Sequence, residues 1–227
     1  MAIWIWNKKL KLNIPDNWNQ VSYSKAIQIL ELDDLKPSSL ISILTGIDEK
    51  IIRQSASKKQ IKALYDVFPY WSNFPVVDQP TMPYVIGFKN QAIAVKHDWS
   101  GAFDLGKVCT VGQIEDMLSI VRNSHSESMQ DIDLFKIYPS LIAIYLQALY
   151  DKSEYDYERA MEMVNDVSEG LSIVVALNVG GFFLLNLHAL TNGKSSGYQK
   201  RSLAMKSLRR AWSNFKKALD LQLRLTR

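Results

Sequence analysis

The sequence predicts a mainly α fold (α+β with minor β): a helical bundle with one or two short β-hairpins and a long C-terminal amphipathic helix. Apolar residues recur at spacings of three and four along most of the 227 residues, and two short stretches alternate with a period of two. Hydrophobic residues make up 47% of the chain, enough to fill a sizeable core. Because Cys109 is the single cysteine, an intrachain disulfide is excluded and the core must rest on apolar packing.

Residues 1–68 are predicted to form a short β element followed by a helical subdomain. Residues 2–14 alternate well enough for a hairpin or an edge strand. Signals for helix starts and stops follow this stretch: the predicted starts are Ser22 or Ser24, Pro37, Asp48 and Ser57, and the predicted stops are Gly46 and Pro69. This spacing predicts three or four short helices.

Residues 69–83 are predicted to form an ordered linker between two halves of the chain. Four prolines in this stretch prevent regular pairing, and three aromatic residues, Tyr70, Trp71 and Phe74, lie between them. These aromatic residues either pack between the two halves or form a partner-binding surface. If they are exposed, we expect them to be binding hot spots.

Residues 84–193 are predicted to form a β-hairpin followed by a second helical subdomain. The hairpin turns at Lys89-Asn90, Thr110 caps the next helix, and further helices are expected over 132–150 and 157–167. Residues 171–190 contain no charge but include polar side chains, so we expect a buried central helix rather than a membrane span. The pair Gly180-Gly181 would then allow close approach of another helix.

Residues 194–227 are predicted to form a basic amphipathic C-terminal helix. They contain ten basic residues and one acidic residue, a net charge of +9, whereas the rest of the chain carries −5. An apolar seam runs along this segment at spacings of three and four: Met205, Leu208, Trp212, Phe215 and Leu219. Basic residues occupy the other faces: Lys206, Arg209, Arg210, Lys216, Lys217 and Arg224.

Three roles remain open for this basic segment. Its seam could dock on the protein's own body and leave a solvated basic face. Trp212 and Phe215 could instead bind a partner helix or an acidic protein surface, or the basic residues could contact nucleic acid or an anionic membrane. No helix-turn-helix, zinc-finger or aromatic RNA-binding motif accompanies the segment, so protein is the first choice of partner and nucleic acid the second.

The sequence does not predict an enzyme, a metal site or a cofactor. The three histidines, His97, His125 and His188, lie far apart in different predicted segments, and Cys109 has no nearby cysteine or histidine at metal-binding spacing. A phosphate-binding glycine loop, a nucleophile elbow and a paired-histidine metal helix are all missing from the sequence. We therefore expect a protein that works by binding other macromolecules.

The order of several short motifs resembles a family of bacteriophage proteins. The motifs are Trp18 followed by VSY at 21–23, ISILTGI at 41–47, CTVGQIED at 109–116, YPSLIAIY at 138–145, YDY at 155–157 and GGFFLL at 180–185. In this order they resemble tail assembly chaperone-like and virion assembly proteins of tailed bacteriophages, notably phages of Bacteroidetes hosts. The resemblance covers residues 18–190 and matches packing positions, so it carries over no catalytic residue.

The resemblance implies a non-enzymatic structural or assembly protein of the phage tail or head–tail region. Its implied partners are other phage structural or tail proteins, with a homo-oligomer as a further alternative. Its implied location is the bacterial host cytoplasm during assembly and, for a structural subunit, the virion. The basic C-terminal segment lies outside the resemblance.

Overall fold

The computed structural model is mainly helical with two short antiparallel hairpins, which confirms the predicted fold class. It describes residues 2–5, 10–32, 36–57, 59–60, 74–75, 77, 80–95, 105–124 and 133–192. The chain divides between residues 75 and 76 into two compact units, a position inside the segment predicted as a linker. We call the described residues up to Pro75 unit 1 and those from Val77 to Asn192 unit 2.

Unit 1 begins with a hairpin and continues into three short helices. Strands β1 (Ala2–Ile5) and β2 (Leu10–Asn13) pair antiparallel, with Ile3 opposite Leu12. After the 3-10 turn η2 (Trp18–Gln20) come α1 (Tyr23–Leu30), α2 (Pro37–Thr45) and α3 (Glu49–Ser55). Their apolar faces form the core of the unit: Val21, Tyr23, Ala26, Ile29, Leu40, Ile41, Leu44 and Ile52 are buried.

Local signals set the helix ends of unit 1 where the sequence predicts them. The Ser22 hydroxyl accepts a hydrogen bond from the backbone N–H of Lys25, and the Asp48 carboxylate caps α3 in the same way. Gly46 ends α2 with a φ of +72°, a conformation that glycine adopts without strain. The Ser57 hydroxyl accepts from Gln60 N–H as a cap would, but residues 61–68 of the predicted fourth helix lie outside the described residues.

Unit 2 begins with the predicted hairpin, formed by β3 (Val85–Phe88) and β4 (Gln91–Ala94). Lys89 and Asn90 form its turn with positive φ angles of 46° and 61°. The Lys89 ammonium pairs with the Asp166 carboxylate and lies 5.8 Å from the Tyr150 ring centroid. The turn is therefore fastened to two helices of the same unit.

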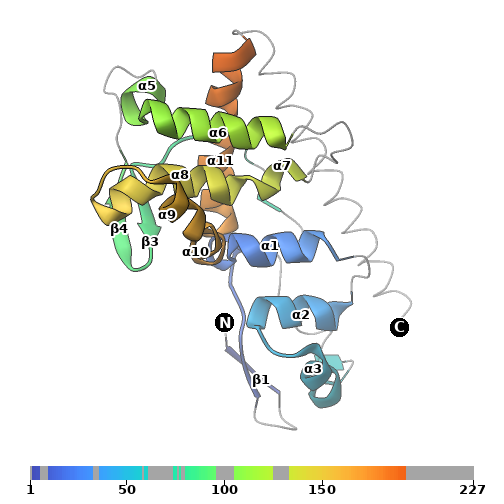
Figure 1. The fold of residues 1–227 in the computed structure, drawn as a ribbon. Helices are drawn as coiled ribbons and strands as arrows, with labels where there is room; N and C mark the ends of the chain where they lie inside the picture. The colour runs from blue at the N-terminus through green and yellow to red at the C-terminus, as the bar shows by residue number, and fades with distance from the viewer. Residues whose placement is uncertain are drawn as a thin grey trace. The chain divides into compact units, whose positions relative to one another are not determined.

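The helices of unit 2 pack around α8 (Tyr138–Asp151). The others are α5 (Leu105–Val108), α6 (Val111–Asn123), α7 (Asp133–Lys136), α9 (Tyr157–Glu162), α10 (Val164–Gly170) and α11 (Ile173–Asn192). Helices α6, α9, α10 and α11 all contact α8, which crosses α11 beside α6 (Figure 1). Seven consecutive residues of α8, 141–147, are buried, so this helix is the centre of the core.

The uncharged stretch forms α11, and its glycine pair allows the predicted close approach. Gly180 and Gly181 are buried, and a Cβ built on Gly180 would lie 2.7 Å from Cβ of Tyr138. Tyr145 also packs against this helix, with its ring centroid 5.1 Å from that of Phe183. In the described part of the chain, no helix is long and apolar enough to cross a membrane.

Two predicted helices are each interrupted once. The helix expected over 132–150 breaks at Ile137 into α7 and α8, because Pro139 lies in the first turn of α8 and has no N–H to continue the ladder. The helix expected over 157–167 breaks at Met163 into α9 and α10. Both breaks keep αR backbone angles, which is why an apolar periodicity does not mark them.

Candidate functional site

An open pocket in unit 2 lies between the start of α6, the end of α8 and the loop that follows α8. Its volume is about 590 Å³, within the range of roughly 300–1,000 Å³ that is typical of ligand pockets. We call it the α6–α8 pocket. It is lined by Lys107, Val108, Cys109, Thr110, Gln113, Tyr145, Ala148, Leu149, Ser153, Glu154 and Tyr155.

A capping box fixes the α6 side of the pocket. The Thr110 hydroxyl accepts from Gln113 N–H, and the Gln113 side-chain oxygen accepts from Thr110 N–H at 2.9 Å. The Gln113 amide nitrogen also donates to the carbonyl of Ile144 at 2.8 Å. One buried glutamine therefore caps α6 and ties its first turn to α8.

A second buried glutamine, Gln147, holds the loop on the other side. Its side-chain nitrogen donates to the Asp151 carboxylate and to the Ser153 hydroxyl, and its oxygen accepts from Asp156 N–H at 2.9 Å. Lys152 ends α8 in the left-handed conformation, with a φ of +53°. These contacts turn the chain sharply, so that residues 153–155 form a wall of the pocket.

Tyr155 closes this wall against α6. Its hydroxyl donates to the Asp116 carboxylate at 2.8 Å, and its ring lies 3.7 Å from where a Cβ on Gly112 would be. Burial, together with the hydrogen bond to Asp116 and its charge, raises the pKa of Tyr155 above the ordinary value of 10.0. The phenol therefore stays protonated at neutral pH and keeps donating its hydrogen bond to Asp116, which positions the loop.

The pocket offers both apolar and polar groups to a bound molecule. The side chains of Val108, Tyr145 and Leu149 offer apolar surface, and the hydroxyl of Ser153 and the carboxylate of Glu154 offer polar groups. Among the described residues, no group of three or more His, Cys, Asp and Glu side chains could hold a metal ion. Cys109 lines the pocket, but the residue is buried, with only 7% of its surface exposed.

Exposed apolar side chains flank the pocket in the chain. Val111, which directly follows the pocket residue Thr110, is 72% exposed, and Tyr157, two residues after Tyr155, is 44% exposed. Both residues are neighbours in sequence of residues that line the pocket, so we treat them as candidate contacts at its edge.

The stretch of chain that continues from the pocket residues 153–155 carries an excess of negative charge. Residues 151–169 contain seven acidic and two basic residues, a net charge of −5, and all nine of these side chains are exposed. One of the acidic residues, Asp166, is paired with Lys89. We call this stretch, which includes α9 and α10, the acidic surface.

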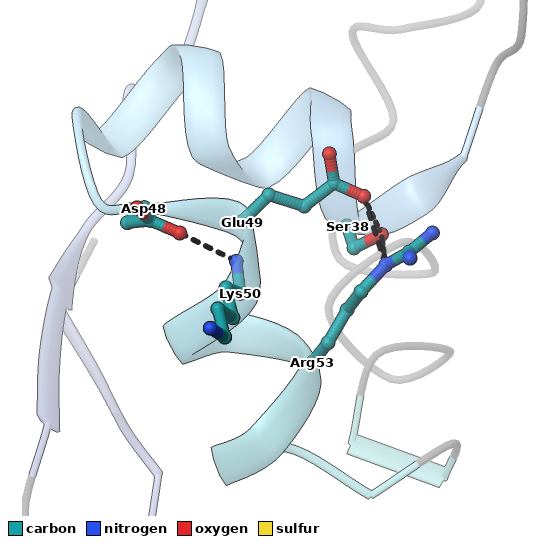
Figure 2. A network of polar contacts seen from close by, with 5 residues as sticks. All are labelled: Ser38, Asp48, Glu49, Lys50 and Arg53. Atoms are coloured by element: carbon teal, nitrogen blue, oxygen red, sulfur yellow. Dashed lines mark hydrogen bonds and ion pairs between the residues drawn. The ribbon is translucent and has the colours of Figure 1, made fainter.

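A polar network in unit 1 is structural. Figure 2 shows the Ser38 hydroxyl between the Glu49 carboxylate, to which it donates at 2.8 Å, and the Arg53 guanidinium, from which it accepts. Arg53 also pairs with Glu49 at 2.9 Å. Burial alone would raise the pKa of Glu49, but hydrogen bonds from two serines and nearby positive charge outweigh it and hold the pKa below 4.5. The network joins α2 to α3.

The structure places one of the partner-binding residues predicted from the sequence. Phe74 is buried at 5% exposure in unit 1, and its ring lies 5.1 Å from that of Trp18 in an edge-on contact. Its role in binding a partner stays a prediction. The other predicted site residues lie outside the described residues: Tyr70, Trp71, Lys206, Arg209, Arg210, Trp212, Phe215, Lys216, Lys217 and Arg224.

Sequence reasoning did not find the α6–α8 pocket. Its walls come from three separate segments, and each lining residue has an ordinary packing or capping role that no motif distinguishes. The charge excess of 151–169 could have been found by counting, since it is visible in a window of nineteen residues. Comparisons of the chain with protein-family models, curated proteins and solved structures find no match.

Proposed function

We propose that this protein is a non-enzymatic structural or assembly protein of a tailed bacteriophage, in the tail or head–tail region, that acts through protein–protein binding. The observation that carries the binding role is the α6–α8 pocket, with exposed Val111 and Tyr157 beside it and the acidic surface next to it. Such a mixture of a pocket with apolar and polar walls and a charged rim is typical of protein interfaces.

The phage setting of this proposal rests on the motif order along residues 18–190. The proposed partners are other phage structural or tail proteins, met in the bacterial host cytoplasm during assembly and, for a structural subunit, in the virion. The acidic surface favours a partner with basic side chains, because complementary charge speeds association and excludes wrong partners.

The proposal is tested by capturing the tagged protein from infected cells and identifying what is bound to it by mass spectrometry. Purified particles and assembly intermediates are measured alongside. We expect phage tail or head–tail proteins to be enriched, and absence from particles, intermediates and captured complexes would contradict the proposal.

A matched pair of variants tests whether the pocket region makes the contact. Val111→Asp places a charge on exposed apolar surface in the first turn of α6, where an acidic residue favours the helix. Ile51→Asp makes the same change in the first turn of α3, in unit 1. We expect Val111→Asp to reduce partner capture several-fold and Ile51→Asp to leave it unchanged.

A nucleic-acid-binding role is the alternative, and the net charge of +9 in residues 194–227 favours it. Binding through Lys206, Arg209, Arg210, Lys216, Lys217 and Arg224 would release counterions from the phosphates, so affinity would fall steeply with salt. Titration of duplex DNA at several salt concentrations measures this slope. An undetectable or salt-independent affinity would exclude the alternative.

A further inference from the structure

The negative charge of the body is concentrated in one stretch of the sequence, residues 151–169, whose charged side chains are all exposed. Residues 1–193 contain 17 basic and 22 acidic residues, a net charge of −5, and residues 151–169 alone account for −5. The remainder of the body is therefore neutral. The acidic surface beside the α6–α8 pocket is thus the part of the described chain that most strongly attracts a basic segment.

The chain itself contains a segment with the complementary chemistry. Residues 198–225 combine basic side chains with the apolar seam that includes Trp212 and Phe215. We propose that this C-terminal segment of the same chain docks on the acidic surface and places an aromatic side chain of its seam in the α6–α8 pocket. This inference rests on the proposed function, because it makes the protein's own segment the first occupant of its partner-binding surface.

The pocket can accept such a side chain. A volume of about 590 Å³ is ample for one indole or phenyl ring. The walls offer apolar contacts from the half-buried Ala148 and Leu149 for the ring, and Glu154 supplies a carboxylate for the basic residues that flank it. An aromatic anchor in a pocket with charged pairs around it is the arrangement expected of a hot spot.

The connection is long enough for docking within one chain. Tyr145, which lines the pocket, packs on Phe183 of α11, and α11 ends nine residues later at Asn192. At 1.5 Å per residue, roughly 14 Å of helix separate Phe183 from that end. The twenty residues from Asn192 to Trp212 span about 30 Å as a helix and up to about 66 Å when extended, so either form covers the distance back along α11.

Docking within the chain would make partner binding competitive. A partner that carries its own basic, aromatic segment must displace residues 198–225 before it reaches the pocket. Residues 198–225 would then cover the acidic surface and the α6–α8 pocket until such a partner arrives, and would prevent their earlier association with other proteins.

Zero-length carbodiimide cross-linking of the full-length protein, followed by mass spectrometry of the isolated monomer, tests this docking. Because the reagent joins a lysine to a carboxylate only when the two are in contact, we expect links from Lys206, Lys216 and Lys217 to the acidic residues of 151–169. We also expect these links to fall several-fold at high salt, which screens the charges.

Two charge-reversal variants separate this site from the other acidic residues. Glu162→Lys, at the end of α9, should reduce the links several-fold, whereas Glu31→Lys makes the same change at the end of α1 in unit 1 and should leave them unchanged. Both side chains are exposed, and surface substitutions usually change stability little, so both variants should still fold. Trp212→Ala should increase amide hydrogen exchange in residues 107–113 several-fold.

Several outcomes would overturn the inference. Links that are missing, that respond equally to the two variants, or that lead to the acidic residues of unit 1 would reject docking on the acidic surface. Links found only in cross-linked dimers would assign the surface to a second copy. Partner capture is measured separately, so capture that persists without intramolecular links would reject this inference and leave the proposed function standing.

Discussion

At Gly180 the absence of a side chain allows α11 to lie against Tyr138 of α8. A Cβ at this position would lie 2.7 Å from both Cβ and Cδ2 of Tyr138, and the Cβ of Tyr138 is fixed by the backbone of α8. The contact joins the uncharged helix to the helix at the centre of unit 2, so its loss would affect the whole core.

We expect Gly180→Ala to destabilise the protein by about 1–3 kcal/mol, as overpacking of a core does. Gly112→Ala is the matched control, because a Cβ there would make an ordinary contact 3.7 Å from Tyr155. That control should be neutral or stabilising, since alanine favours a helix by roughly 0.5–1 kcal/mol over glycine. Denaturant unfolding measures both, and equal effects of the two changes would contradict the packing argument.

Glu49 gives unit 1 a dependence on acidic pH. Its pKa is below 4.5 in the folded protein, so its contribution to stability is complete above that value and is lost as the pH falls through the folded pKa. We expect Glu49→Gln to flatten the stability profile at acidic pH, in the range that begins near 4.5 and extends down through the lowered folded pKa, where folded and unfolded states differ in bound protons. Unfolding of the wild type, Glu49→Gln and the exposed control Glu154→Gln at each pH tests this. A profile unchanged in Glu49→Gln would contradict it.

At the scale of elements, Gln147 determines how α8 passes into α9. Its buried side-chain amide forms hydrogen bonds with Asp151, Ser153 and the backbone N–H of Asp156. Asp156 is in turn the N-cap of α9. We expect Gln147→Leu to lower the free energy of unfolding by about 1–3 kcal/mol, because the polar groups of the loop lose the hydrogen bonds that they make to this side chain.

The same substitution should loosen the wall of the α6–α8 pocket. Hydrogen exchange of residues 151–156 should rise in Gln147→Leu, whereas Gln28→Leu, which changes an exposed glutamine of α1, should leave exchange and stability near the wild-type values. If residues 151–156 stay as protected as in the wild type, Gln147 does not hold the loop.

The elements that could be predicted from the sequence are those with a local chemical signal. Ser22, Asp48 and Thr110 cap helices as expected, the hairpin turns at Lys89-Asn90, and Gly46 and Asn90 adopt the positive φ angles that glycine and asparagine favour. The pocket could not be predicted, because it depends on the long-range bond from Gln113 to Ile144 and on the turn after α8. Such contacts depend on tertiary packing, which residue spacing does not encode.

At the scale of the whole chain, each unit has a core of its own. The core of unit 1 is built from α1, α2 and α3, and that of unit 2 from the helices around α8. Domains with separate cores can in principle fold separately. We therefore expect denaturant to unfold the two units in distinguishable steps.

Leu40→Ala tests this independence. Leu40 is buried in unit 1, so the change should cost about 2–5 kcal/mol. Native-state hydrogen exchange followed by mass spectrometry should show lost protection in residues 36–57 and unchanged protection in residues 138–151. Equal loss in both ranges would show that the two units unfold as one.

The position of α11 at the end of unit 2 has a consequence for the newborn chain. Helix α8 is synthesised first, but the surface that covers Tyr138 and Tyr145 belongs to α11, whose last residue is made about forty residues after the end of α8. At roughly 5–20 residues per second, this delay lasts about 2–8 seconds. During translation, the surface of α8 that α11 covers in the folded unit is therefore exposed for this interval. We expect molecular chaperones to bind the nascent chain at this stage.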